Sequence, residues 1–298
     1  MNDKRILVLP GEKAVLAENG PLHLVIQAWS GKKPEIEKAR EAADYAFDCL
    51  ASVAEALPVL KKRHGLITGS LNRLPVKDIA KTMIESVRRI GDEDLTPMAA
   101  VAGTIADYTA DCLFQGNITR VIVDNGGDIA IRLSPGESVV VGLRPVIESS
   151  DLSHVIRIDS RYNTWGVNTS GMGGRSFTRG IASAVTVFAA TSSLADAAAT
   201  AIANACSAEH ENIRRRPANS IDPNTDLGDM TVTVGFSDLP EETFAAALEK
   251  GLIKALDTMM KGHIRGAVLA VGGMMALTPG FRENVGDITP YETFQEIR

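Results

Sequence analysis

The sequence predicts an α+β fold in which mixed or antiparallel sheets pack with helices. Segments with the two-residue alternation of strands occur near the start of the chain and again after Gly116. Between them lie three segments with the spacing of amphipathic helices. Strands and helices follow in irregular order with short connections, which favours antiparallel sheet. With 298 residues and 45% hydrophobic content, residues 1–298 can form one domain, or two closely joined halves.

Strands are predicted where apolar and β-branched residues alternate between turn residues. The Asn19-Gly20 pair between two such runs is a strong hairpin signal, so the chain is expected to open with antiparallel strands. After Gly116, a strand leads through a second Asn-Gly turn into its return strand. The predicted strands cover residues 6–9, 14–17, 22–29, 120–124, 129–131, 138–143, 155–158, 164–168, 183–189, 230–236 and 267–271.

Helices are predicted where apolar residues recur every three or four positions. Pro34 stands where a long helix can begin, because proline is tolerated in the first turn, and this helix is expected to end near Pro58. The predicted helices cover residues 34–58, 76–90, 98–115, 193–206 and 241–261.

Charge and hydropathy argue against several classes of function. The net charge is -6 and the longest basic cluster is the three arginines at 214–216, so no nucleic-acid partner is expected. The first apolar run is too short for a signal sequence, and no apolar stretch approaches the roughly 20 residues of a membrane helix. We therefore expect a cytoplasmic protein without membrane attachment. The three separated cysteines predict inert, mostly buried thiols rather than disulfides or a zinc cluster, with one reactive cysteine as the alternative.

Asp196 and Thr200 form the first candidate site. They stand four residues apart in a predicted Ala-rich helix, so a carboxylate and a hydroxyl lie one turn apart on one face. Both are hard oxygen ligands, which suit Mg²⁺ when water or ligand phosphates complete the coordination. The alternative is structural: Asp196 is a favourable charge near the positive end of the helix, and Thr200 hydrogen-bonds to the preceding turn.

The turn Asn125-Gly126-Gly127-Asp128 is the second candidate. It follows a predicted strand, and its two glycines allow positive φ and close approach of a ligand to the backbone. Asn125 and Asp128 can hold the hydrogen-bonding edge of a ligand. A plain hairpin turn is the alternative, because Asn-Gly is the commonest hairpin signal.

The third candidate is the segment 168–180, which contains four glycines, several hydroxyl residues, Arg175 and Arg179. Its amides and guanidinium groups can cradle a phosphate or pyrophosphate. A flexible surface loop is the alternative. A fourth segment, 222–229, has oxygen spacing similar to that of a calcium loop but lacks the glutamate that such a loop needs, and an acidic turn is the better interpretation.

Taken in order, these segments resemble the ApbE family, the FAD:protein FMN transferases, which use Mg²⁺ to move FMN from FAD to a protein threonine. The resemblance implies an ApbE-like fold, similar to the T-fold, with Mg²⁺ on Asp196 and Thr200 and with FAD or FMN as ligand. The matching residues are Gly103, Tyr108 and Asp111 on the family's G-G-I-A-K-G-Y-A-V-D helix, Asn125, Gly126, Gly127 and Asp128 on its N-x-G-G-D turn, Thr169, Ser170 and Gly171 on its T-S-G step, and residues 183–189 and 195–201 on its S-V-T-V strand and A-D-A-L-A-T-A helix.

The sequence also departs from the family. Ala106 replaces the family lysine, Met172 replaces the aspartate after T-S-G, and the H-x-x-D-P-x-T-G segment is absent. This pattern resembles a divergent ApbE-like branch found in archaea and anaerobic bacteria and linked to sulfide assimilation into homocysteine. The resemblance implies a Mg²⁺-dependent, transferase-like protein for a flavin or another phosphate-bearing ligand, with a sulfur-assimilation protein as partner. The alternatives are a non-catalytic accessory protein, and FMN transfer to a protein threonine. No catalytic residue is assigned.

Overall fold

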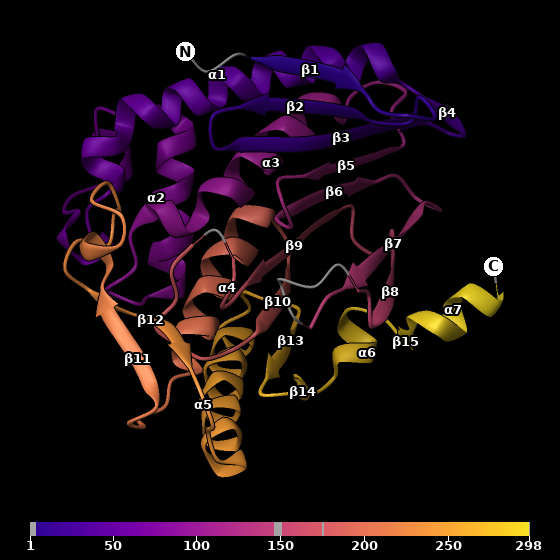
Figure 1. Ribbon diagram of the computed structural model, residues 1–298. Coiled ribbons are helices and arrows are strands. Elements are labelled where there is room, and N and C mark those ends of the chain that lie inside the picture. Colours follow the sequence, from indigo (N-terminus) through magenta and orange to yellow (C-terminus); the bar gives the residue numbers. More distant parts are fainter. Residues whose placement is uncertain (1–3, 146–150, 175, 298) are drawn as a thin grey trace. The chain divides into compact units, whose positions relative to one another are not determined.

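The computed structural model describes residues 4–145, 151–174 and 176–297, whose contacts group into two compact units. Figure 1 shows their helices and strands along the chain. Unit 1 comprises Met1–Ser138, Asp159–Asn168 and Ala189–Ala197. Unit 2 comprises Val139–Ile158, Thr169–Phe188 and Ala198–Arg298.

Unit 1 is built on antiparallel strands paired in the order β1-β2-β3-β5-β6-β9, with β4 paired to β3 (Figure 1). In β3, the residues Leu22, Leu24, Ile26 and Ala28 are buried in strict alternation. Successive side chains of a strand point to opposite faces, so this alternation makes one face of the sheet apolar. The strands are β1 (Arg5–Val8), β2 (Val15–Asn19), β3 (Leu22–Ser30), β4 (Lys33–Pro34), β5 (Arg120–Asp124), β6 (Ile129–Leu133) and β9 (Thr164–Ser170).

Three helices of unit 1 pack against this sheet or against one another. α1 and α3 contact strands of the sheet and each other, and α2 contacts both helices. The prediction placed the start of α1 at Pro34, but the helix begins at Ile36. Pro34 instead belongs to β4 and pairs with Trp29 of β3. The helices are α1 (Ile36–Leu60), α2 (Asp78–Ile90) and α3 (Val101–Leu113), with 3₁₀ turns η1 (His64–Leu66), η2 (Leu71–Arg73) and η3 (Pro97–Ala100).

In unit 2, β10 pairs with β13 and β13 pairs with β14, all antiparallel. Every residue of β10 and β13 is buried, which explains why their sequences are almost entirely apolar. Two smaller sheets have the orders β11-β12 and β15-β8-β7, and the long helix α5 contacts β13 and β14. The elements are β7 (Ser138–Leu143), β8 (His154–Asp159), β10 (Ala184–Ala189), β11 (Ile213–Pro217), β12 (Thr231–Phe236), α5 (Glu241–Met260), β13 (Gly266–Val271), β14 (Met274–Leu277), α6 (Phe281–Asn284), β15 (Ile288–Pro290) and α7 (Tyr291–Ile297).

The predicted fold class is confirmed: helices pack with antiparallel sheets. The apolar pattern does not predict β11, β14, β15, α6 or α7. β11 shows the reason, because it contains three successive arginines and is a strand only through its pairing with β12. Across the described residues, each helix is too short or too polar to cross a membrane.

Candidate functional site

Helix α4 (Ser192–Ala205) carries the first predicted pair. From residue 192 to residue 203, every side chain of this helix is buried except those of Asp196 and Thr200. The two lie one helical turn apart and are partly exposed. Residues 192–197 belong to unit 1, and the helix continues into unit 2. This mostly buried helix thus leaves one carboxylate and one hydroxyl partly exposed on a single face.

The carboxylate of Asp196 lies against the start of α3. The backbone N–H of Gly103 donates to its Oδ2 atom at 2.9 Å, and the N–H of Ala102 also hydrogen-bonds to it. Burial raises the pKa of Asp196 well above its ordinary value, and the nearby charges of Asp128 and Asp107 raise it further. The two backbone donors lower the pKa but do not outweigh these effects. Asp196 therefore lies in an acidic environment and is held by main-chain donors.

The second predicted element connects β5 to β6. The N–H of Asn125 donates to the carbonyl of Asp128 at 3.0 Å, which closes the turn. The backbone φ angles of Gly126 and Gly127 are 69° and 104°, values that residues other than glycine rarely adopt. The segment is therefore a hairpin turn, and its contact with a ligand stays a prediction.

The polar ends of this turn also have partners within unit 1. Asn125 is buried, and its Nδ2 donates to the carbonyl of Ala102 at 3.2 Å. The Oδ1 atom of Asp128 accepts a hydrogen bond from Nδ2 of Asn168 at 3.0 Å. Ala102 thus contacts both the turn and Asp196. The turn and the start of α4 meet at the same end of α3.

A buried ion pair holds the start of α4. The carboxylate of Asp107 accepts the N–H groups of Ser192 and Ser193 at 3.0 and 2.8 Å. Arg132 of β6 donates to the same carboxylate at 2.9 Å and to Asp111 at 2.6 Å. Burial by itself lowers the pKa of Arg132, but the two aspartates outweigh it and raise this pKa. Asp107 of α3 thus caps the start of α4, and Arg132 balances its charge.

Two further contacts tie α4 to the strands of unit 1. The hydroxyl of Ser192 donates to Oδ1 of Asn168 at 2.9 Å, and both residues are fully buried. A Cβ atom on Gly103 would collide with the carbonyl oxygen of Ser192 and with the Asn168 amide. Only glycine allows α3 to approach α4 this closely.

These contacts include three residues that the sequence did not single out as functional, Asp107, Arg132 and Ser192, together with Asn168, the first residue of the predicted phosphate-binding segment 168–180. A signal was present for Asp107 and Arg132, since each is a charge among mainly apolar neighbours in its helix or strand. Charges are rarely buried without a partner, so a pair of this kind was to be expected. No local signal marks Ser192, and the signal at Asn168 predicted phosphate binding rather than its contacts with Ser192 and Asp128.

The remaining glycine-rich candidates belong to unit 2. Thr169 and Ser170 end β9 rather than lying in a loop as predicted. The hydroxyl of Thr169 lies 2.8 Å from that of Thr186. Gly171 has a φ of 155°, and a Cβ there would lie 2.6 Å from the carbonyl oxygen of Ser183. The T-S-G step is therefore built into the sheet, and its contact with a ligand stays a prediction.

Of the two arginines in this segment, Arg179 has defined backbone contacts. The N–H of Arg179 donates to Oδ1 of Asn204 at 2.9 Å, and its carbonyl accepts the hydroxyl of Thr233 at 3.0 Å. The backbone of Arg179 is thus fixed within unit 2. Arg175 lies outside the described residues. Phosphate binding by either arginine stays a prediction.

The donor set around Asp196 suits one kind of metal. Among the residues that the structure describes, no three His, Cys, Asp or Glu side chains are grouped to hold an ion. Structural zinc needs such a group, whereas Mg²⁺ is commonly held by one or two carboxylates, waters and ligand phosphates. Asp196, with Thr200 one turn away and the charge of Asp128 nearby, fits Mg²⁺.

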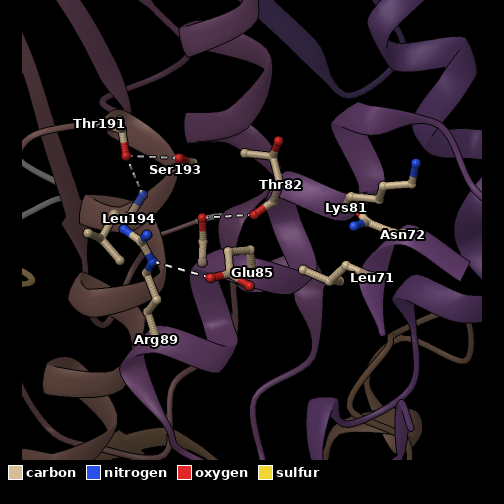
Figure 2. Close-up of a pocket in the computed structure, with 10 residues that line it drawn as sticks. Leu71, Asn72, Lys81, Thr82, Glu85, Arg89, Thr191, Ser193 and Leu194 are labelled. Carbon is tan, nitrogen blue, oxygen red and sulfur yellow. Dashed lines mark hydrogen bonds and ion pairs between the residues drawn. The ribbon is translucent and has the colours of Figure 1, made fainter. Parts of the chain in front are cut away.

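A pocket of about 320 Å³ lies in unit 1 and is lined by residues of α2 and η2, by the residue preceding α4 and by the first turn of α4 (Figure 2). Its charges already have partners, since Arg89 donates to Glu85 at 3.4 Å. The hydroxyls of Thr191 and Ser193 lie 3.0 Å apart on its other wall. No predicted ligand residue is among those lining it, which are Leu71, Asn72, Lys81, Thr82, Glu85, Ser86, Arg89, Thr191, Ser193 and Leu194.

Comparison with known structures supports the fold. The apo crystal structure of the flavinyl transferase ApbE of Pseudomonas stutzeri aligns with a TM-score of 0.50 at 14% sequence identity, covering 95% of this chain and 97% of that protein. At this identity the likeness concerns the fold alone.

Sequence comparisons give the family. A UPF0280 protein of Methanopyrus kandleri is 43% identical over 132 residues, covering 44% of this chain and 51% of that protein. A UPF0280 protein of Methanococcus vannielii is 40% identical over 132 residues, covering 43% of this chain and 51% of that protein. The matched region thus spans about half the length of these archaeal relatives. The family model described as "AbpE bacteria" matches residues 7–277. The chain therefore belongs to this ApbE-like family.

Proposed function

We propose that this chain binds Mg²⁺ together with a phosphate-bearing ligand, a flavin nucleotide, beside Asp196. One observation carries the proposal: a partly exposed carboxylate, held by two backbone N–H groups, lies within the electrostatic reach of Asp128. Two neighbouring carboxylates repel each other, and a divalent cation offsets that repulsion. The flavinyl transferase fold neighbour and the family match support the flavin as ligand.

The residues of the chain take distinct parts in this proposal. Asp196 and Thr200 would hold the cation through their side-chain oxygens, with water and a ligand phosphate as its further ligands. The chemistry that a bound Mg²⁺ would supply there is polarisation of a phosphate oxygen. The exposed glycines Gly126 and Gly127 leave the backbone of the turn open to a flat ring or a ribose.

The reaction that follows binding is a separate question. Ala106, which stands at the position of the family lysine, is a fully buried methyl group. This departure favours a second candidate function, a non-catalytic accessory protein that binds the nucleotide and serves a sulfur-assimilation enzyme. Flavin transfer to a protein threonine is the third. Covalent flavin on a threonine-bearing target, incubated with FAD and Mg²⁺, would establish transfer. Co-purification of a sulfur-assimilation enzyme, without turnover by the isolated protein, would establish the accessory role.

Calorimetry tests the binding itself. FAD is titrated into the purified full-length chain with Mg²⁺ and then with EDTA in its place. We expect Mg²⁺-dependent binding that Asp196→Ala weakens by at least about tenfold, because a charged ligand to the ion is lost. Thr200→Val, which removes only the hydroxyl, should weaken binding less. Asp111→Asn is the matched control, since the Asp111 side chain is 65% exposed and pairs with Arg132.

Two results would contradict the proposal. One is the absence of FAD, FMN and ATP binding by the wild-type chain in the presence of Mg²⁺. The other is an Asp196→Ala variant that binds as tightly as the wild type. The visible absorption spectrum of the purified protein is a rapid first measurement, because bound flavin absorbs in this range.

A further inference from the structure

A continuous set of buried contacts links the ion pair of Asp107 and Arg132 to the carboxylate of Asp128. Asp107 holds the N–H of Ser192, the Ser192 hydroxyl donates to Asn168, and Asn168 donates to Asp128. We propose that these contacts position both acidic residues of the candidate cation site. Asp107, Ser192 and Asn168 are then positioning residues, an inference that rests on the proposed function.

The first step is the contact between α3 and α4. The first N–H groups of a helix have no acceptor within the helix, and Asp107 accepts two of them in α4. Gly103 and Asp107 lie one turn apart on α3, and Ser192 and Asp196 lie one turn apart on α4. Asp107 contacts Ser192, and Gly103 contacts Asp196. The cap is therefore one turn from the candidate ligand on both helices, so a shift of the helix start also moves the Asp196 carboxylate.

Charge explains why this cap holds its place. A carboxylate is favourable at the positive end of a helix, but a buried one needs a partner. Asp107 is 4% exposed and Arg132 is 2% exposed, so each supplies the opposite charge that its buried partner needs. Arg132 belongs to β6, which begins directly after the turn that ends in Asp128. The pair thus joins α4 to the strand that carries the second acidic residue.

The second step is the orientation of the Asn168 amide. Its Oδ1 accepts the Ser192 hydroxyl, and its Nδ2 donates to Asp128. With the amide reversed, the Asn168 carbonyl oxygen would face the Asp128 carboxylate, and the two acceptors would repel each other. The hydroxyl of Ser192 therefore favours the orientation that holds Asp128 in place.

A purely structural role is the competing explanation, and the chain contains matched controls for it. Asp111 bonds the same arginine as Asp107, but its side chain is 65% exposed. Ser193 follows Ser192 directly, and its hydroxyl lies against that of Thr191 rather than against Asn168. Substitution of either control residue leaves the proposed contacts intact.

The test compares full-length wild type with four variants: Asp107→Asn, Asp111→Asn, Ser192→Ala and Ser193→Ala. Hydrogen exchange followed by mass spectrometry reports on the amides of residues 192 and 193. Calorimetry with FAD reports the Mg²⁺ concentration for half-maximal binding, which a loss of general stability would not shift in a folded protein. All measurements are made where each variant is folded.

We expect Asp107→Asn to raise the required Mg²⁺ concentration by about tenfold or more, as loss of a charged hydrogen bond implies. The amides of residues 192 and 193 should also exchange faster, because Asn offers one acceptor oxygen in place of two. Asp111→Asn should stay within about threefold of wild type, the scale of an exposed pair. Ser192→Ala should raise the Mg²⁺ requirement by about fivefold without faster exchange, and Ser193→Ala should change neither quantity.

Equal behaviour of Asp107→Asn and Asp111→Asn in both measurements would overturn the inference. If Asp107→Asn does not fold, Ser192→Ala against Ser193→Ala decides, and equal Mg²⁺ requirements for these two would overturn it. If the wild type binds no FAD with Mg²⁺, the proposed function fails separately. The exchange comparison then decides whether Asp107 fixes the start of α4, and unchanged exchange in Asp107→Asn would refute that as well.

Discussion

The substitution Asp196→Asn should stabilise the metal-free protein and abolish its response to Mg²⁺ and FAD. The physical reason is the environment of the carboxylate, which is disfavoured by burial and by the charge of Asp128. Asn keeps an oxygen that can accept the N–H of Gly103, so the 2.9 Å hydrogen bond is retained while the charge is removed. Asp196, which the proposed function needs, thus lowers the free energy of unfolding of the metal-free protein.

The magnitude follows from the burial of a poorly compensated polar group. Removal of such a group changes the free energy of unfolding by about 1–3 kcal/mol, so Asp196→Asn should gain this amount near pH 7. For a chain of this size, each kcal/mol corresponds to about 2–4 °C in melting temperature. With ligand at about 100 times its Kd, the wild type should gain about 2.7 kcal/mol, and the variant should gain little. The order of the two melting temperatures should therefore reverse, or the gap should close, when Mg²⁺ and FAD are added.

The pH dependence has a defined sign. The pKa of Asp196 is raised in the folded state, so the folded protein holds this proton more tightly than the unfolded chain does. The stabilisation by the protonated form is complete below the unfolded pKa, which is about 3.9. It is lost as the pH rises from there through the folded pKa. Asp196→Asn should lack this part of the pH dependence.

The assay is thermal unfolding followed by circular dichroism, from acid to neutral pH, with EDTA or with Mg²⁺ and FAD. Asp111→Asn is the control, because that side chain is largely exposed. A metal-free Asp196→Asn protein that melts below wild type, or that keeps the wild-type slope of stability against pH, would refute the reasoning.

Two further predictions concern groups outside the proposed ligands. Iodoacetamide at pH 8 should label one thiol per native chain, Cys112, because it is exposed whereas Cys49 and Cys206 are buried. Burial raises the pKa of Cys49 to about 11 and that of Cys206 to about 12, so their thiolate fractions are about 0.1% or less; mass spectrometry that finds native labelling at either site would contradict this. Gly103→Ala should lower the free energy of unfolding by about 3 kcal/mol, because its Cβ would meet backbone atoms of α4. Gly65→Ala should change it by less than about 0.5 kcal/mol, since a Cβ there lies at an ordinary 3.5 Å from Glu93, and urea unfolding curves that coincide for the two variants would disprove the explanation.

Local sequence periodicity predicted many of the helices and strands. Period-two alternation located β3, and helical spacing located α1, α2 and α5, because both periodicities are set by the backbone of a single element. The relative placement of Asp196 and Thr200 on one helix face has the same origin, since positions four apart on any helix are neighbours. Where a segment lacks such a pattern, as β11 does with its three arginines, pairing with a distant strand decides its structure.

The sequence by itself thus determined the α+β class, the Asn-Gly-Gly-Asp turn and the polar pair on α4. Only the tertiary structure decided what surrounds that pair. Asp107 caps Ser192 from 85 residues away, and Asn168 reaches Asp128 across 40 residues. Such contacts depend on how α3, α4 and the strands of unit 1 pack, and no local period encodes them. Gly103 is the clearest case, because its need for glycine comes from the backbone of α4 rather than from its own conformation.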